Sequence, residues 1–453
     1  MDLEIVLTPG LGNATYLIAS GDEAVVVDPP RDAWRVAAVA ASRGWRLTHA
    51  LETHVHNDYL SGALELRASH RTEIVAPARG RYAFPHRGVE AGEDVRVGGL
   101  RLVARATPGH TPEHLAWDVV PDGATDPEAV LTGGSLLVGS AGRTDLLGDA
   151  MLDELTAAQF RSLQALAALP DSVAVLPTHG AGSFCAAGPS DGARTSTIGA
   201  ERFHNPLLRA TEPSRFREGL LAGFAPYPTY YREMAPINRS GPTVLGALPV
   251  PPALDPVGAR AAIAAGARVI DGRSRTAFAA GHLADGLNIE LDDSFGSYVG
   301  WHVPFGTPIL LVMPEPWEEA VAEATAQLIR IGYDAIPGWL DGGVERWAAE
   351  GGVLHAYPVA TAGDVRREVA TGAAPHLLDV RDPNESSAAR VPGAQEIPHW
   401  ELAARLGELP RDEEVTVLCK SGARASIAAS VLDAAGVPVR LVTVGGAPEL
   451  GRP

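Results

Sequence analysis

The stretch His54-Val55-His56-Asn57-Asp58-Tyr59 directly follows an apolar run, Leu47 to Leu51, that predicts a β-strand. Alternate residues of an extended segment point to the same side, so the side chains of His54, His56 and Asp58 converge where the strand ends. Imidazole and carboxylate groups that converge in this way are typical ligands of zinc or iron. The alternative interpretation is a polar loop with two surface histidines, and further histidine motifs downstream weaken it.

Three later segments place polar side chains in glycine turns after predicted strands. They are Thr107-Pro108-Gly109-His110-Thr111, Pro177-Thr178-His179-Gly180, and Thr132-Gly133-Gly134-Ser135, which leads into Gly142-Arg143-Thr144-Asp145. A single histidine in a turn is usually solvated. Four histidines in this order, each at the end of a predicted strand, indicate one common site.

The composition bounds the class of protein. The chain has 453 residues, and 37 basic against 55 acidic residues give a net charge of −18. Hydrophobic residues make up 46% of the chain, which is enough for several cores, and no apolar run reaches about 18 residues. Cys185 and Cys419 are too few for a disulfide framework. We therefore expect a soluble, cytoplasmic homo-oligomer that binds neither nucleic acid nor membranes.

The strand and helix patterns divide the chain into four segments. Residues 1–185 alternate short β-rich runs with turns and helical patterns, which predicts an α/β domain of many short strands. Residues 186–250 hold little strand pattern and several prolines, and we interpret them as a helical extension and linker. Residues 251–355 and 356–453 are predicted to be two homologous α/β domains with parallel sheets.

An internal repeat supports the last two domains. Its members are apolar strands and glycine pairs: Val269 to Arg273 with Leu377 to Arg381, Ile309 to Met313 with Val415 to Cys419, and Gly342-Gly343 with Gly445-Gly446. Because the intervals between these members agree closely in both copies, we expect the same succession of strands and helices in each.

The loop Cys419-Lys420-Ser421-Gly422-Ala423-Arg424 lies between a predicted buried strand and a helix. Such a loop aims backbone N–H groups inward and places the positive helix end beneath the thiol, which favours the thiolate. This arrangement suits a nucleophile that takes a sulfane sulfur from an anionic donor. Two alternatives stay open: hydrolysis of phosphate esters, whose loops of this type are usually one residue longer, and a buried structural cysteine.

The first copy of the repeat lacks this nucleophile. Met313-Pro314-Glu315-Pro316 takes the place of the cysteine loop, so two prolines remove N–H donors and Glu315 adds a negative charge. We expect the first copy to bind no sulfur and to serve as a scaffold.

The repeat, about residues 255–453, resembles the rhodanese family. The resemblance rests on Asp271-Gly272-Arg273 with Gly281-His282, on Asp379-Val380-Arg381 with Pro392-Gly393-Ala394, and on the Cys419 loop. It implies that Cys419 carries the persulfide, and that Lys420, Ser421, Gly422, Ala423 and Arg424 hold the substrate anion. The second copy departs from the family after Gly445-Gly446, where the usual tryptophan-bearing helix is missing.

Residues 1 to about 200 resemble the metallo-β-lactamase superfamily, with its αββα sandwich, and within it the glyoxalase II and persulfide dioxygenase branch. Combined with the repeat, the chain resembles the persulfide dioxygenase–rhodanese fusions. The resemblance implies Fe(II) held by His54, His110 and an aspartate. Tyr59 stands where the superfamily has a histidine, Gly134 stands where it has that aspartate, and Ser140 replaces a second acidic residue.

These departures leave several ligand sets open. His56 could complete a three-histidine set with His54 and His110, or Asp58 could supply a carboxylate. Asp58, Tyr59, His179 and Arg143 are expected to surround the ligands. The cofactor is Fe(II) or Zn, or the site holds no metal.

The sequence thus predicts a sulfur-metabolism enzyme, a sulfurtransferase of the thiosulfate or persulfide type that uses Cys419. Its N-terminal domain resembles a persulfide dioxygenase with an impaired metal site. The expected partners are small thiols, persulfides or thiosulfate. The alternatives are a thioester hydrolase like glyoxalase II, which normally needs two zinc ions, and a non-catalytic sulfur carrier or binding scaffold.

Overall fold

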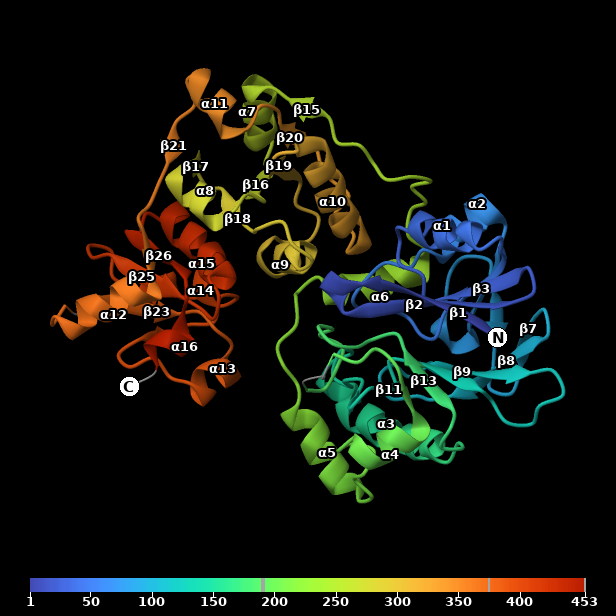
Figure 1. The fold of residues 1–453 in the computed structure, drawn as a ribbon. Helices are drawn as coiled ribbons and strands as arrows, with labels where there is room; N and C mark the ends of the chain where they lie inside the picture. The colour runs from blue at the N-terminus through green and yellow to red at the C-terminus, as the bar shows by residue number, and fades with distance from the viewer. Residues whose placement is uncertain (189–191, 374, 452–453) are drawn as a thin grey trace. The chain divides into compact units, whose positions relative to one another are not determined.

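The computed structural model of the protein describes residues 1–188, 192–373 and 375–451. The chain forms two compact units, Met1–Pro249 with Ala326–Gly332, and Val250–Thr325 with Tyr333–Pro453 (Figure 1). The expected helical extension belongs to the first unit, and both repeat copies contribute to the second. The last two residues of the predicted domain 356–453 lie outside the described residues. Among the described residues, no helix is both long and apolar enough to cross a membrane.

The first unit is built on two six-stranded sheets. The strands of the first sheet, in spatial order, are β1 (Asp2–Thr8), β2 (Asn13–Ser20), β3 (Glu23–Val27), β4 (Arg46–Leu51), β5 (Glu73–Pro77) and β6 (Arg87–Val89). Those of the second are β14 (Ser196–Thr197), β13 (Ala174–Pro177), β10 (Ala129–Gly133), β9 (Leu115–Pro121), β8 (Leu100–Ala106) and β7 (Asp94–Val97). A separate pair is formed by β11 (Leu136–Leu137) and β12 (Ser140–Ala141). From β3 to β6 the pairing is parallel, and β1 to β3 pair antiparallel.

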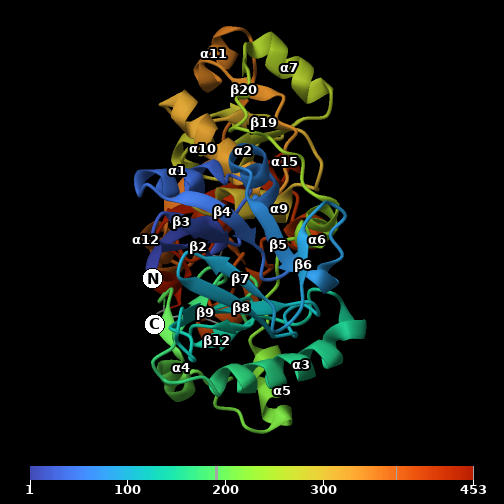
Figure 2. The ribbon, with the colours of Figure 1, turned by 90° about the vertical axis from the view of Figure 1, so that its right-hand side faces the viewer.

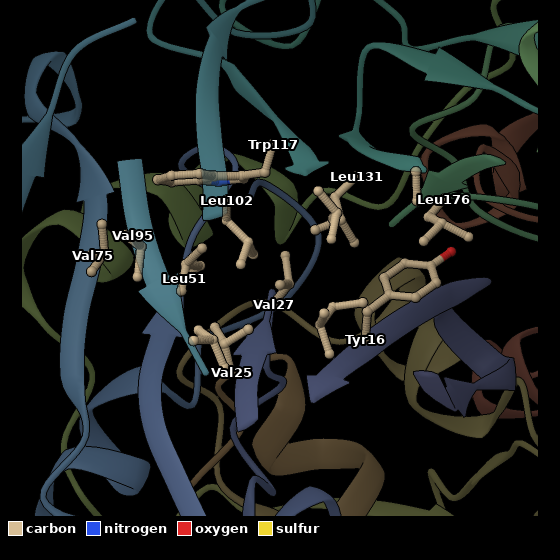
Figure 3. Packing of buried hydrophobic residues seen from close by; sticks show 14 of the residues in the cluster. Tyr16, Val25, Val27, Leu51, Val75, Val95, Leu102, Trp117, Leu131 and Leu176 are labelled. Carbon is tan, nitrogen blue, oxygen red and sulfur yellow. The ribbon is translucent and has the colours of Figure 1, made fainter. Parts of the chain in front are cut away.

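The apolar core lies between the two sheets. Successive residues of a strand face opposite sides, so Val25 and Val27 of β3 point into this core whereas Ala24 and Val26 pack on the other face. The second sheet contributes Leu102 and other fully buried side chains, among them Trp117 (Figure 3). Each buried aliphatic side chain contributes about 1.5–3 kcal/mol relative to exposure.

Helices cover the outer faces of both sheets. The first sheet is covered by α1 (Trp34–Ser42) and α2 (Ala63–His70), and the second by α3 (Asp149–Ala167), α4 (Ile198–His204) and α5 (Pro213–Ala222) (Figures 1 and 2). One further helix, α6 (Tyr231–Ser240), completes the unit. The predicted αββα sandwich is confirmed.

The second unit contains two five-stranded parallel sheets with the same topology. In the first copy the spatial order is β15 (Ala253–Leu254), β20 (Gly338–Leu340), β19 (Ile309–Val312), β16 (Arg268–Asp271) and β18 (Leu287–Asn288). In the second it is β22 (Val359–Thr361), β26 (Val439–Val444), β25 (Val415–Leu418), β23 (His376–Asp379) and β24 (Gln395–Glu396). The strands that the repeat aligns therefore take equivalent places.

Helices follow the strands in both copies. The first copy has α7 (Pro256–Ala264), α8 (Arg275–Ala280), α9 (Phe295–His302), α10 (Trp317–Arg330) and α11 (Gly343–Ala349), with a small ribbon of β17 (His282–Leu283) and β21 (Leu354–His355). The second has α12 (Ala362–Ala370), α13 (Pro383–Ala388), α14 (Leu402–Arg405), α15 (Ala423–Ala434) and α16 (Ala447–Leu450). A single turn, α16, thus follows Gly445-Gly446, where the sequence lacks the tryptophan-bearing helix.

The two copies share part of their core. Phe278 and Ala279 of α8 pack in the same apolar cluster as the strands of the second copy. The His282 imidazole also lies 3.1 Å from the Asp433 carboxylate of α15. Contacts of this kind join the copies into one unit, so residues of the first copy are available to a site in the second.

Candidate functional site

The histidines predicted at strand ends form one buried cluster in the first unit. His54 follows β4, His110 follows β8, and His179 follows β13, and each side chain is fully buried. One ligand atom from each of these three residues lies within 4.8 Å of the others. The cluster therefore combines residues that are more than 120 positions apart in the chain.

Hydrogen bonds set the tautomer of each ring. His110 donates through Nδ1 to the Arg143 carbonyl (2.7 Å), and His179 donates through Nδ1 to Oδ1 of Asn13 (3.0 Å). The Thr53 hydroxyl gives its proton to Asp28, so it accepts from Nδ1 of His54 at 2.8 Å. The Nε2 atom of each ring therefore carries a lone pair, as in metal-binding histidines whose other nitrogen is held by a protein acceptor.

The three lone pairs face the same small space. His54 Nε2 lies 3.3 Å from His179 Nε2, and His110 Nε2 has no hydrogen-bond partner among the described residues. Burial and the neighbouring histidines lower the pKa of His110 and of His179 to about 3 each, so all these rings are neutral at pH 7. Neutral imidazoles with converging lone pairs fit Zn²⁺ or Fe²⁺, and without a cation they repel one another.

His56 is held differently from the other three. Its Nε2 lies 3.1 Å from Glu52 and 3.3 Å from Asp28, and it donates to the Tyr59 hydroxyl at 3.0 Å. Burial alone lowers the pKa of His56, but these carboxylates raise it to about 10. Nδ1 of His56 is buried and has no hydrogen-bond partner among the described residues. The structure groups His56 with Asp28 and His54, and with Asp58 and His179, but not with His54 and His110 together. His179 thus offers a third imidazole to His54 and His110, and ligation by His56 stays a prediction.

Asp58 and Tyr59 lie beside the cluster as expected. Asp58 accepts from Asn13 (2.7 Å) and lies 3.4 Å from Nδ1 of His179, and burial raises its pKa. Tyr59 donates to the carbonyl of Asp28 at 3.1 Å. Burial raises the pKa of Tyr59 well above its ordinary value, so its hydroxyl stays neutral. Tyr59 thus contributes a hydrogen bond where a histidine would contribute a ligand.

Gly134 lies against the ring of His110. A Cβ at this position would lie 2.3 Å from Cδ2 of His110, and the N–H of Gly134 donates to Nε2 of His114 at 2.9 Å. The aspartate that the resemblance implies here therefore has no room while His110 keeps its place. At position 134 the chain therefore lacks both the carboxylate ligand and the space that an aspartate side chain would need.

Arg143 supports the cluster from its backbone. Its carbonyl holds His110, and its guanidinium binds Asp145 and lies 4.5 Å from the ring centre of Tyr227. The guanidinium of Arg143 therefore faces Asp145 and the helical extension, and not the lone pairs of the histidines.

A cavity of about 700 Å³ in the first unit is lined by three arginines and two glutamates, Arg79, Arg81, Arg239, Glu113 and Glu154. One of these side chains, Glu113, accepts from the backbone N–H of Val55 at 2.9 Å, so a single hydrogen bond links the cavity lining to the histidine motif. The arginines make this cavity suitable for a ligand with carboxylate groups.

Several functional residues were not predicted from the sequence. Asp28 accepts hydrogen bonds from Thr53 and Thr178 and pairs with His56, and Asn13 and His114 hold other members of the cluster. Asp28 could have been found, because it directly follows the apolar run Ala24 to Val27, whose strand pairs with the strand that leads to His54. Asn13 and His114 carry no comparable pattern.

The Cys419 loop joins β25 to α15 in the second unit. Cys419 is 1% exposed, and the N–H of Gly422 donates to its Sγ at 3.1 Å. Gly422 has a φ of 102°, and it precedes the first residue of α15, Ala423. Because this N–H at the helix start has no partner within the helix and points at the sulfur, the loop stabilises negative charge on Sγ.

The cationic side chains of the loop have different surroundings. Arg424 forms ion pairs with Asp382 (2.9 Å) and with Glu385. Lys420 and Ser421 are exposed, and in the described part of the chain Lys420 makes no ion pair. Arg424, predicted as an anion ligand, is already paired with carboxylates.

The first copy has a closed loop in the equivalent place. Met313 is 2% exposed, and a Cβ at Gly272 would lie 2.7 Å from its sulfur. The thioether fills the place of a nucleophile, in agreement with the sequence.

Comparison with known proteins supports both parts of this architecture. The Metallo-beta-lactamase superfamily model matches residues 8–179, and the Rhodanese-like domain model matches residues 361–447, within the second copy only. A hydroxyacylglutathione hydrolase of Rhodopseudomonas palustris (strain BisA53) is 34% identical over 252 residues, which cover 50% of this chain and 95% of the relative.

Two solved structures are similar to this chain, and the first supports the same relationship. A metallo-beta-lactamase from Staphylococcus aureus subsp. aureus COL is 29% identical with a TM-score of 0.67, covering 75% of this chain and 98% of that protein. ETHE1 from Myxococcus xanthus is 28% identical with a TM-score of 0.46, covering 53% and 99%. The chain therefore belongs to the metallo-beta-lactamase superfamily, and it carries a rhodanese-like domain in its second unit.

Proposed function

We propose that this protein is a sulfur-metabolism enzyme in which Cys419 transfers sulfane sulfur and the histidine cluster binds one metal ion. The first copy of the repeat is, in this proposal, a rhodanese-derived module without a nucleophile, because its sheet has the same strand order as that of the second copy. The substrates are small thiols and persulfides or thiosulfate.

The hydrogen bond from Gly422 to Cys419 Sγ is the observation that carries the transferase proposal. In the reaction, the Cys419 thiolate attacks the outer sulfur of a donor, the bond between the two donor sulfurs breaks, and its electron pair leaves with the remainder of the donor. Cys419 is then a persulfide, and an acceptor nucleophile removes the outer sulfur. The N–H groups at the start of α15 stabilise the anionic sulfur before and after transfer.

The histidine cluster supports a single-metal site. His54, His110 and His179 would hold the ion through Nε2, with Thr53, the Arg143 carbonyl and Asn13 fixing the rings. A bound ion would supply Lewis acidity toward the sulfur of a thiol or persulfide. The chain itself orients the ligands and excludes water, because all three rings are fully buried.

The sulfur-transfer reaction is tested with the Cys419→Ser variant of the full chain. Thiocyanate formation from a sulfur donor and cyanide should fall to the background rate, while the folding of the variant stays normal by circular dichroism. Unchanged transfer by Cys419→Ser would remove Cys419 from the mechanism.

The second candidate is hydrolysis of a glutathione thioester, which the hydroxyacylglutathione hydrolase relatives favour. Such hydrolysis normally needs two metal ions, and Tyr59 and Gly134 withhold ligands of a second ion. Metal analysis of the purified protein, with parallel assays of thioester hydrolysis and persulfide-dependent oxygen uptake, separates these activities. Two metal ions per chain with thioester hydrolysis would favour the second candidate, whereas one ion with oxygen uptake would favour a persulfide dioxygenase activity.

A further inference from the structure

Helix α9 of the first copy places an aromatic side chain at the Cys419 site. The ring of Tyr298 contacts that of His399 from the second copy, with a distance of 5.7 Å between ring centres. The backbone N–H of His399 donates to the carbonyl of Val380 (3.2 Å), and the N–H of Val380 donates to the carbonyl of Leu418 (3.0 Å), the residue before Cys419. Tyr298 therefore lies at the edge of the second sheet at which Cys419 is found.

The aromatic surface continues from Tyr298 across both copies. Trp301 of α9 stacks on Trp400 at 5.2 Å between ring centres and 28° between planes. Nε2 of His302 and Nδ1 of His399 form a hydrogen bond of 2.9 Å directly beside them. Tyr298, Trp301 and Trp400 are each partly exposed to solvent. We call these three side chains the aromatic wall.

The charges around the loop are largely compensated. Arg424 is paired with Asp382 and Glu385, and Arg275 of the first copy is paired with Glu290 while it also donates to the Ser421 carbonyl. Lys420 is exposed. The two paired arginines therefore add little net electrostatic attraction for a small dianion such as thiosulfate. A donor with an organic body gains instead from burying that body against aromatic rings.

We propose that the aromatic wall binds the organic part of a low-molecular-weight persulfide, so that Cys419 exchanges sulfur with organic persulfides in preference to thiosulfate. This proposal rests on the proposed transferase function of Cys419. In the step, the Cys419 thiolate attacks the outer sulfur of R–S–SH, and the bond between the donor sulfurs breaks. The electron pair leaves as R–S⁻, Cys419 becomes Cys–S–SH, and no external oxidant or reductant is consumed. The first copy then has a role beyond that of the predicted scaffold, because Tyr298 and Trp301 select the donor.

The test compares two donors with the full chain, cyanide as acceptor and oxygen excluded, so that oxidation of the donor does not compete. For glutathione persulfide, Trp301→Ala should raise KM roughly tenfold through the loss of stacking and apolar burial, with little change in kcat. For thiosulfate, KM should change less than about twofold, because a small anion does not reach the wall. Tyr298→Phe, which keeps the ring, should retain most of the preference for glutathione persulfide.

The matched control is Trp317→Ala, a tryptophan of the same copy that contacts Trp339 instead of the wall. This variant should leave KM and kcat unchanged for both donors. An equal loss for both donors in Trp301→Ala would show a structural role only, and no loss for either would show that the wall is not used; both results overturn the proposal. Cys419→Ser tests the transferase function separately. If Cys419 is the nucleophile, this variant loses activity with both donors; if Cys419 is not the nucleophile, the variant keeps activity with both.

Discussion

Asp28 illustrates how the polar groups of the histidine cluster depend on one another. Its carboxylate accepts from the N–H and the hydroxyl of Thr53 and from the hydroxyl of Thr178, and it pairs with His56. A buried carboxylate without such partners would cost several kcal/mol. The cluster therefore contains a network that is fully supported only when strands from both sheets are in place.

His179→Ala is predicted to reduce bound metal. The variant removes one of three imidazoles whose ligand atoms lie together, so metal affinity should fall by at least about tenfold. Asn13→Ala, which frees Nδ1 of His179, should cause a smaller loss. Metal content per chain, measured after dialysis against a weak chelator, checks both. His70→Ala, at an exposed position on α2, is the control. Full metal content in His179→Ala would instead favour the set of His54, His56 and His110 that the sequence predicts.

Gly134→Asp is predicted to lower metal content instead of restoring a carboxylate ligand. The new Cβ would lie 2.3 Å from the His110 ring, so His110 must leave its place before the carboxylate can enter. Overpacking of this kind typically costs about 1–3 kcal/mol. Gly134→Ala introduces the same Cβ without a carboxylate, and thermal denaturation with metal analysis compares the two. If Gly134→Asp binds more metal than both the wild type and Gly134→Ala, then aspartate is a ligand and this prediction is wrong.

At the scale of the elements, the position of each site follows from where strands end. Cys419 lies directly after β25, at the carboxyl end of a parallel strand, where ligand sites of parallel sheets form. The apolar run that predicts β25 and the small residues that follow it are visible in the sequence. The contact that holds the loop in place is not visible in the sequence. It comes from Gly446, which follows a different strand, β26, and packs against the loop.

Gly446→Ala is predicted to impair sulfur transfer by disturbing the loop. A Cβ at Gly446 would lie 2.3 Å from the carbonyl oxygen of Cys419, and this carbonyl also accepts from the N–H of Ala447 at 2.9 Å. Stability should fall by about 1–3 kcal/mol, and kcat should fall more than KM rises, because the nucleophile itself is displaced. Gly407→Ala in the same copy has open space around the new Cβ and serves as the control. Equal transfer rates in the two variants would contradict the role of Gly446.

The stability of the second unit is predicted to fall as the pH decreases from about 6.5. Burial lowers the pKa of His302 to about 4, and burial together with His302 and Arg424 lowers that of His399 to about 2. The unfolded imidazoles titrate near pH 6.5, so below that pH the unfolded chain binds protons that the folded pair does not. Stability is therefore full above pH 6.5 and decreases as the pH falls toward about 4.

Unfolding midpoints between pH 7 and pH 5 measure this effect. The double variant His302→Gln with His399→Gln should show a flatter pH dependence than the wild type, since two titrating groups are removed. Identical slopes for the two proteins would show that this histidine pair does not contribute.

At the scale of the whole molecule, two units with different sheet architectures lie on one chain, and both are proposed to act on sulfur compounds. Covalent linkage raises the effective concentration of an intermediate that passes from one site to the other, without any new contact. An equal mixture of the full-length variants Cys419→Ser and His179→Ala, each with one site disabled, should therefore convert a persulfide donor more slowly than the intact chain at low micromolar concentration. Equal rates of product formation at every concentration would argue against coupling.

The sequence by itself determined the α/β class, the internal repeat and the cysteine loop. These follow from local patterns: short apolar runs between turns, matching strands such as those ending at Asp271 and Asp379, and a nucleophile at a strand end. Local patterns also located four histidines at strand ends. They did not determine which of these histidines would face one another.

Only the tertiary structure decided that question and the surroundings of both sites. Asp28 and Glu52 engage His56, and His179 lies with His54 and His110; Asp382 and Glu385 engage Arg424, and Tyr298 of the first copy contacts His399 of the second. The physical reason is the same in each case. The charge state and orientation of a buried polar group depend on partners that the fold brings from distant positions, and such partners leave no trace in the local pattern.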